Sequence, residues 1–318
     1  MKKALLLAIA VIAIGGFFMF GRGGEKAATA PVTPVKPVAV ADTIVIYDGL
    51  FSEVHIVHRM VKELVEAETK LKVNIKDEMA PVNQFNELTR GGHDLMLSYD
   101  GTLLTTYLLL DPQDVPEGVT VYDFANEKGK EMKGVMLLGK LGINNTYAIG
   151  VPQEIADKHG LETLSDLAEV AEQLSFGAEH DFFTEAGMAK FNPFAKFYGL
   201  KFKDVRQIDV NLKYSAVKSG NIDVTVVYST DGLNREAKLK VLADDRNYFP
   251  EYNGALLVRT DFFDKYKAAA PDLDKTLAKL NNIFTDEDMI DLTYEVDINN
   301  RTPAEAAKGY LQKKGLIK

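Results

Sequence analysis

The chain of 318 residues contains no cysteine and only five histidines. Without cysteine it forms no disulfide, no thiolate zinc site and no cysteine nucleophile, and it lacks the bacterial lipoprotein anchor, which needs a cysteine at its processing site. Also absent are the Gly-x-Ser-x-Gly, Walker, dinucleotide-binding and His-Glu-x-x-His motifs. These absences argue against an enzyme, and they predict that the protein has no cofactor.

Two of the histidines, His55 and His58, are three residues apart in a segment with a helical pattern. That spacing can place both on one metal ion, but no third ligand follows at a suitable distance. We therefore favour a packing or surface role for both histidines and predict no metal site. A metal-dependent hydrolase is the weakest of the alternatives that the sequence leaves open.

The net charge of the chain is -9. An excess of carboxylates argues against a nucleic-acid partner, because neutralising phosphates needs a basic face. Basic residues outnumber acidic ones within residues 1–42, so the acidic excess lies in the rest of the chain. An acidic body favours a cationic ligand, although solubility alone explains such a charge in many proteins.

Two lysines, Lys2 and Lys3, precede an apolar run over residues 4–20. A short basic region followed by such a run predicts an export signal over residues 1–20. One potential cleavage site is directly followed by Pro31, which disfavours cleavage. We therefore favour an uncleaved N-terminal anchor in the membrane over a cleaved signal, and in both cases we expect the body of the protein to be extracytoplasmic.

The segment between this run and the body, residues 21–42, is rich in Gly, Ala, Pro, Val and Thr. It shows no amphipathic period, which is typical of a flexible linker. Such a linker would tether the body close to the membrane.

From Thr43 onward, short β-rich runs alternate with helical patterns. Strands are predicted at 43–47, 72–75, 94–98, 175–178, 205–209, 224–228 and 256–259, and residues 134–151 are predicted to form one or two strands. Helices are predicted at 52–65, 82–88, 102–110, 153–159, 164–173 and 212–219. An aromatic stretch up to Gly199 shows no regular pattern, and the region after Arg259 is helical and polar. Alternation on this scale predicts an α/β fold with mostly parallel sheets.

Five short motifs occur in an order and spacing that, taken together, indicate a protein family. They are Phe51-Ser52-Glu53, Tyr99-Asp100-Gly101-Thr102, Asn144-Asn145-Thr146-Tyr147-Ala148-Ile149, Lys213-Tyr214-Ser215-Ala216 and Tyr228-Ser229-Thr230-Asp231-Gly232. In order and spacing they resemble the glycine betaine/carnitine/choline-binding proteins of osmoprotectant ABC importers. The resemblance extends over nearly everything from residue 43 to the C-terminus.

This resemblance implies a two-lobed clamp of the type II periplasmic-binding-protein class that captures a small quaternary-ammonium ligand for an ABC transporter permease. Lobe one is expected to comprise residues 43–146 and 250–318, and lobe two residues 147–249. The chain crosses between the lobes near Tyr147 and Phe249, where a hinge would let the clamp close.

The same resemblance implies that four tyrosines form an aromatic cage around the ligand: Tyr99, Tyr147, Tyr214 and Tyr228. A quaternary ammonium has no N–H to donate, but it binds to the electron-rich faces of aromatic rings. The backbone carbonyl of Asn145 is expected to face the cation as well. The plainer interpretation is that these are ordinary half-buried tyrosines among the 13 in the chain. We expect a structural role for Asp231, and packing roles for Tyr107, Tyr122, Tyr198, Tyr252 and Phe182.

The sequence departs from the family where betaine-binding members hold the ligand's carboxylate with a lysine, an arginine and a threonine. Only the threonine, Thr102, is retained. Gly49 stands at the lysine position, beside Asp48 and close to His55, and Glu185 aligns with the arginine, although Lys190 is near enough to replace that charge.

We therefore expect Asp48, His55 and Glu185 near the polar end of the ligand. A carboxylate buried among acidic groups would lack a charged partner, which costs several kcal/mol. The sequence favours choline or a similar quaternary amine without a carboxylate, with glycine betaine and carnitine as the alternatives. A membrane-tethered ligand sensor or adaptor is the other functional class that stays open.

Overall fold

The computed structural model describes residues 41–183, 190–209 and 212–318. The predicted anchor (residues 1–20), nearly all of the predicted linker (21–42) and Glu185 lie outside the described residues. Among the described helices, none combines the length and the apolar character needed to span a membrane.

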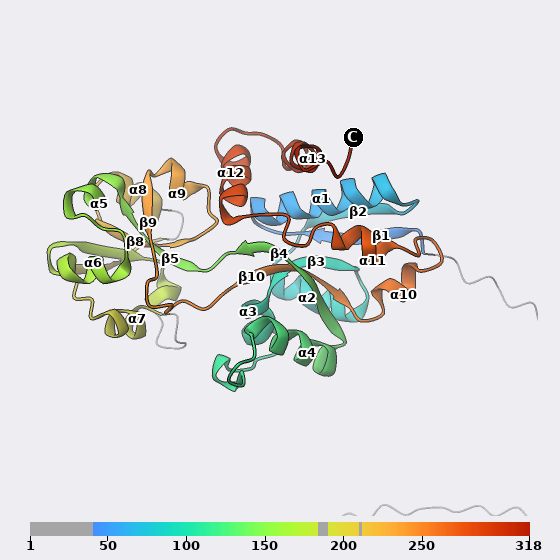
Figure 1. Ribbon diagram of the computed structural model, residues 1–318, viewed down its shortest axis with the longest axis horizontal. Coiled ribbons are helices and arrows are strands. Elements are labelled where there is room, and N and C mark those ends of the chain that lie inside the picture. Colours follow the sequence, from blue (N-terminus) through green and yellow to red (C-terminus); the bar gives the residue numbers. More distant parts are fainter. Residues whose placement is uncertain (1–40, 184–189, 210–211) are drawn as a thin grey trace, which may run out of the picture. The chain divides into compact units, whose positions relative to one another are not determined.

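Lobe one, the name kept here for residues 43–146 and 250–318, contains two runs of elements (Figure 1). The first run is β1 (Thr43–Asp48), α1 (Ser52–Glu68), β2 (Lys72–Glu78), α2 (Pro81–Arg90), β3 (Leu95–Tyr99), α3 (Asp100–Thr102), η1 (Leu103–Tyr107), η2 (Pro112–Asp114), α4 (Val121–Lys133) and β4 (Val135–Asn144). The second run is β10 (Asn253–Arg259), α10 (Phe262–Tyr266), α11 (Leu273–Ala278), α12 (Asp286–Asp297) and α13 (Pro303–Lys313).

Lobe two, residues 147–249, lies between these runs in the chain. Its elements are β5 (Tyr147–Pro152), α5 (Gln153–His159), α6 (Leu164–Val170), η3 (Ala171–Gln173), β6 (Ser175–Ala178), η4 (His180–Phe183), α7 (Phe191–Tyr198), β7 (Asp204–Gln207), α8 (Lys213–Lys218), β8 (Val224–Tyr228), α9 (Leu233–Glu236) and β9 (Leu239–Leu242).

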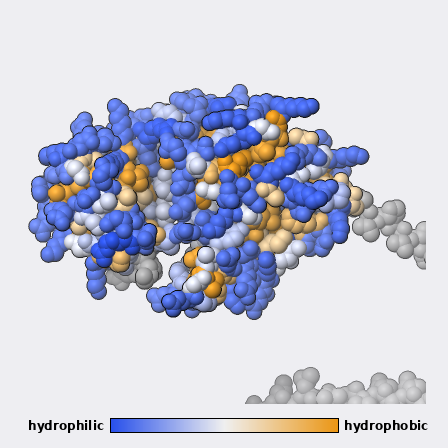
Figure 2. Space-filling view, viewed as in Figure 1, coloured by the Kyte–Doolittle hydropathy of each residue, from blue (hydrophilic) through white to orange (hydrophobic). Residues whose placement is uncertain are grey.

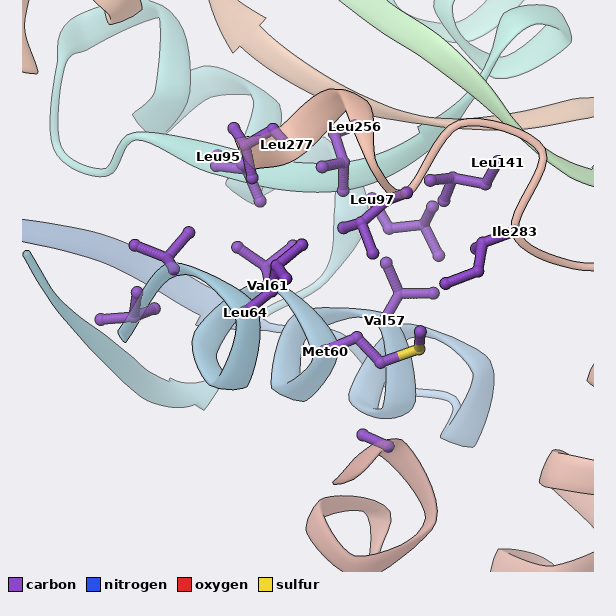
Figure 3. Close-up of a cluster of buried hydrophobic side chains, with 14 of the residues drawn as sticks. Val57, Met60, Val61, Leu64, Leu95, Leu97, Leu141, Leu256, Leu277 and Ile283 are labelled. Atoms are coloured by element: carbon purple, nitrogen blue, oxygen red, sulfur yellow. The ribbon is translucent and has the colours of Figure 1, made fainter. Parts of the chain in front are cut away.

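The hydrophobic spacing of α1 explains how lobe one is built. Val57, Met60, Val61 and Leu64 recur at intervals of three and four residues, so they lie on one face of the helix. All four are buried, and Figure 3 shows them in one cluster with leucines of β3, β4 and β10. This packing holds α1 against the strands and thereby fixes where its first turn points.

Buried hydrophobic residues form separate clusters in the two lobes. Among the described residues, two clusters consist of residues within 44–143 and 255–311, which belong to lobe one. Two further clusters consist of residues within 149–249, which belong to lobe two. Hydrophilic residues cover most of the face in Figure 2, with hydrophobic ones in separate groups between them. Separate cores support the proposed division into two lobes, because a rigid body needs its own core.

The strands of the described residues form sheets of two, three and five strands, in the orders β1-β2, β3-β10-β4 and β7-β6-β8-β5-β9. Among the described strands, β1 with β2, β6 with β7 and β6 with β8 pair in parallel, while the other four pairings are antiparallel. The α/β class is as predicted, but the expectation of mostly parallel pairing is wrong. One reason is that β4 leads out of lobe one and β10 leads back into it, so these neighbours run in opposite directions.

The two crossings between the lobes lie side by side. The Asn145 backbone N–H donates to the carbonyl of Tyr252 at 3.0 Å. The Thr146 hydroxyl donates to the carbonyl of Pro250 at 2.8 Å, and the Ser229 N–H donates to the carbonyl of Thr146 at 3.0 Å. These bonds place the end of β4, the start of β5 and the end of β8 near one another around the crossings.

Candidate functional site

Tyr147 and Tyr228 form the first aromatic pair of the site. They face each other in the antiparallel register of β5 and β8. Directly opposed residues lie close enough for their side chains to interact, and here the ring centroids are 5.5 Å apart with the planes 24° from parallel. Burial raises the pKa of the Tyr147 phenol to about 12 and raises that of Tyr228 as well, so both phenols are neutral at physiological pH.

Lys213, the first residue of α8, places a cation on Tyr228, one member of this pair. Its side chain is buried, and its Nζ is 4.8 Å from the ring centroid of Tyr228 and 5.5 Å from that of Tyr214. Both distances lie within the range of a cation–π contact. The same Nζ is 3.2 Å from Oε2 of Glu179, which compensates its charge. Two of the four predicted cage tyrosines therefore contact one ammonium group, and a third, Tyr147, is stacked on one of them.

Tyr214 is held by Asp231. Its hydroxyl donates to Oδ2 of Asp231 at 2.6 Å, while Oδ1 accepts the N–H of Leu233 at 2.9 Å, at the start of α9. These two bonds support the structural role that we predicted for Asp231, since the aspartate holds both the start of α9 and the phenol of Tyr214. The predicted packing role of Phe182 is confirmed too, since it is fully buried with its ring centroid 5.3 Å from that of Tyr147.

In lobe one, Tyr99 ends β3 and stacks on Tyr252. Their ring centroids are 5.4 Å apart with the planes 29° from parallel. The Tyr252 hydroxyl shares a 2.7 Å hydrogen bond with the Thr102 hydroxyl. Gly101 makes this approach possible, because a Cβ there would be 2.1 Å from the Tyr252 ring. Tyr252 was predicted to have only a packing role, but it contacts two predicted site residues, Tyr99 and Thr102.

Glu53, a buried carboxylate in the first turn of α1, is a further residue of the site that was not predicted. It accepts hydrogen bonds from the Tyr99 hydroxyl, from Thr230 Oγ1 at 2.8 Å and from Asn145 Nδ2 at 3.4 Å. Burial raises the pKa of Glu53 above its usual value despite these donors. The carboxyl thereby connects a tyrosine of lobe one, a crossing residue and a threonine of lobe two.

Asn145 is anchored at the crossing as well. Besides its bond to Glu53, its backbone N–H donates to Tyr252, and its side-chain Oδ1 is buried without a hydrogen-bond partner among the described residues. An unpaired buried acceptor is costly, so a donor or a cation close to it would be stabilising.

Asp48 and the two neighbouring histidines lie at the start of lobe one. Asp48 Oδ1 accepts from His58 Nδ1 at 3.1 Å, and Oδ2 accepts from Arg59. His55 Nε2 lies 2.8 Å from the carbonyl of Gly49. These partners support structural roles for Asp48 and His55, and their predicted contact with the ligand stays a prediction.

His58 has no nitrogen left for a metal. Its Nε2 accepts the backbone N–H of Leu97 at 3.0 Å, so Nδ1 carries the proton that it donates to Asp48. Burial lowers the pKa of His58, which keeps the ring neutral. Within the described parts of the chain, no group of three histidine, aspartate or glutamate side chains is arranged to hold a metal ion.

The contacts of Asp48 predict a loss of stability in acid. Burial alone would raise its pKa, but the hydrogen bonds from His58 and Arg59 lower it to about 2 from the usual 3.8. A depressed pKa contributes stability that is present above the usual value and is lost as the pH falls towards 2, here about 2 kcal/mol. Asp48→Asn should therefore be less stable than the wild type at pH 7, and the difference should shrink between pH 4 and pH 2.5.

Urea unfolding monitored by circular dichroism at several pH values measures this difference. Asp264→Asn, on an exposed aspartate of α10, is the matched control. A gap between Asp48→Asn and the wild type that does not change with pH would contradict the assignment.

A pocket of about 510 Å³ lies beside Tyr228. Its described lining residues are Glu179, His180, Asp181, Gln207, Ile208, Asp209 and Tyr228. It contains three carboxylates and no lysine or arginine among these residues. Lys190, which we considered as a replacement for the missing arginine, donates from Nζ to the Asp181 backbone carbonyl at 2.7 Å.

Comparisons with known proteins agree with this architecture. The model of the family OpuAC, "Substrate binding domain of ABC-type glycine betaine transport system", matches residues 42–313. The carnitine transport binding protein OpuCC of Listeria monocytogenes is 32% identical over 275 residues, which cover 86% of this chain and 87% of that protein. The ergothioneine transport permease/ergothioneine binding protein EgtU of Helicobacter pylori is 36% identical over 231 residues, or 72% of this chain, but the match spans only 40% of EgtU.

Among solved structures, the crystal structure of a glycine betaine/carnitine/choline ABC transporter superposes with a TM-score of 0.76 at 29% identity, covering 87% of this chain and 99% of the other. The predicted type II binding-protein fold and the predicted absence of an enzymatic role are confirmed by these matches. Since the family model spans nearly the whole described body, this chain belongs to the family of substrate-binding domains of ABC-type glycine betaine transport systems.

Proposed function

We propose that the protein captures a quaternary-ammonium compound outside the cytoplasm, between tyrosine rings, and delivers it to an ABC transporter permease. Substrate-binding proteins of this family act outside the cytoplasm and work with such permeases. We further propose that residues 1–20 anchor the chain in the membrane, which the mass of the exported protein tests.

The observation that carries the proposal is the contact of the Lys213 ammonium with the rings of Tyr228 and Tyr214. It indicates that these rings lie where a cation is stabilised by their π faces. A methylated ammonium gains the same attraction, about 0.5–2 kcal/mol per ring according to how far the contact is desolvated. Such a ligand would add to these contacts those of Tyr147, which is stacked on Tyr228.

Lobe one offers a second stacked pair, Tyr99 and Tyr252. The hydrogen bonds of Glu53 to Tyr99 and Thr230 connect this pair to lobe two. We propose that both pairs face the ligand, so that closing the clamp surrounds the ammonium with rings and removes water from it. Removing water strengthens a cation–π contact, because the cation has no competing solvent.

For the rest of the ligand we propose a choline-type compound rather than glycine betaine. By the resemblance described above, we expect Gly49 and Glu185 to stand where betaine-binding members hold a carboxylate with a lysine and an arginine. The pocket beside Tyr228 adds three carboxylates near the site. A ligand carboxylate placed there would meet like charges, which is unfavourable in a partly buried site. The relatives' names include carnitine and ergothioneine, so other quaternary amines are the competitors to test.

Competition calorimetry on the purified protein tests both parts of the proposal. Tetramethylammonium should bind weakly and stoichiometrically, choline should bind more tightly, and glycine betaine and carnitine should displace choline only at higher concentration. Failure of every quaternary amine to bind would refute the cage. Tight binding of glycine betaine with weak binding of choline would be compatible with the tyrosine cage but would refute the proposal that the ligand is of the choline type.

A further inference from the structure

Glu179 is a buried carboxylate that is only half satisfied. It follows β6 directly and is 7% exposed. Oε2 pairs with Lys213 Nζ at 3.2 Å, whereas Oε1 is buried and has no hydrogen-bond partner among the described residues. A buried acceptor left without a donor costs roughly 1–3 kcal/mol, and more when it is charged. The fold tolerates this cost at one carboxylate, next to the aromatic site.

The position of this carboxylate relative to the cage follows from Lys213. The ammonium that pairs with Oε2 is the same one that lies on the rings of Tyr228 and Tyr214. Glu179 also lines the 510 Å³ pocket, which Tyr228 borders. A ligand whose ammonium contacts Tyr228 can therefore extend into a space bounded by Glu179.

The charges of the pocket indicate what that extension carries. Asp181 and Asp209 line it together with Glu179, and no lysine or arginine does among the described residues. The nearby ammonium of Lys213 is already paired with Glu179. The pocket therefore favours a hydrogen-bond donor and disfavours a carboxylate.

We propose that Glu179 is the specificity-determining residue of the site: its unpaired Oε1 accepts a hydrogen bond from an O–H or N–H group that the ligand carries close to its quaternary ammonium. Lys213 compensates the charge of Glu179 and holds the carboxylate in place beside the pocket. This inference rests on the proposed binding of a quaternary amine and adds a chemical requirement for the other end of the ligand.

The test compares choline with O-methylcholine, which has the same ammonium but no hydroxyl donor. Tetramethylammonium reports on the cage alone. In the wild type, choline should bind at least about tenfold more tightly than O-methylcholine, because hydrogen bonds to charged groups are the stronger ones. In Glu179→Met/Lys213→Met, which removes the acceptor and its counter-ion together, the ratio of the two affinities should fall to about one.

Two further variants keep the test decisive. Glu179→Gln removes the charge and retains the size, so the ratio should fall in this variant even if the double variant does not fold. Glu162→Gln removes a carboxylate from the exposed pair of Glu162 with Lys240 and should leave the ratio unchanged. Equal binding of choline and O-methylcholine to the wild type, or a ratio that survives both Glu179 variants, would overturn the inference. Binding of tetramethylammonium in the same experiment shows whether the cage itself stands.

Discussion

Replacing Tyr228 with alanine is expected to weaken the binding of a quaternary amine by about 1–3 kcal/mol, or roughly fivefold to 150-fold. The change removes a ring that faces a cation and takes away the stacking partner of Tyr147. The expected loss exceeds one cation–π contact because water also gains access to the ligand. Tyr147→Ala should give a similar loss, and the double variant should lose less than the sum because the two rings support each other.

Titration calorimetry with choline measures these losses. The phenylalanine variants of both positions should be milder, since the ring faces remain. Tyr47→Ala is the matched control, because Tyr47 also carries a lysine ammonium, that of Lys76 at 4.9 Å, on its ring but belongs to β1 and not to the site. If both alanine variants bound choline like the wild type, the cage would have to be abandoned.

The pairing of Tyr147 with Tyr228 shows what the sequence could predict. Tyr228 was placed at the end of a predicted strand and Tyr147 near the crossing between the lobes, and the register of β5 and β8 sets the two residues opposite each other. The fold class could be predicted because the spacing of hydrophobic residues distinguishes strands from helices. The alternation of the two along the chain then indicates an α/β fold.

The ion pair of Glu179 with Lys213 shows what the sequence could not predict. The two residues are 34 positions apart, and neither stands in a local pattern that indicates burial. Long charged residues are mostly exposed, so only the folded chain reveals that this lysine lies under two rings. Tyr252 was missed for a related reason, although its place just after the return crossing, opposite Asn145, was a usable signal.

The aromatic stretch before Gly199 was misjudged from its composition. We expected it to lack regular structure up to Gly199, yet Phe191–Tyr198 forms α7. Phe194 is fully buried, with its ring centroid 5.2 Å from that of Phe249. Aromatic residues have middling helix propensity, so tertiary packing decided the outcome here.

Glu53→Ala is expected to lower the free energy of unfolding by about 2–4 kcal/mol. Each buried donor that loses its partner costs roughly 1–3 kcal/mol, and partial rearrangement of the site keeps the total below the sum for three donors. Glu53 is the shared acceptor for Tyr99, Thr230 and Asn145, and its removal leaves these donors in a buried site without a partner. Glu63→Ala, at a partly exposed position of the same helix, controls for the change in helix propensity.

The pH dependence of Glu53→Gln distinguishes a buried carboxyl from a simple contact. Because burial raises the pKa of Glu53, the folded state holds its proton more tightly than the unfolded state does. The wild type must therefore lose stability as the pH rises above the usual pKa of a glutamate, whereas glutamine, which carries no titrating proton, escapes this loss. Urea unfolding should show that the free energy of unfolding of Glu53→Gln rises relative to that of the wild type between pH 4.5 and pH 8. A constant difference over that range, or a loss in Glu53→Ala no larger than in Glu63→Ala, would show that Glu53 is not the buried junction between the lobes.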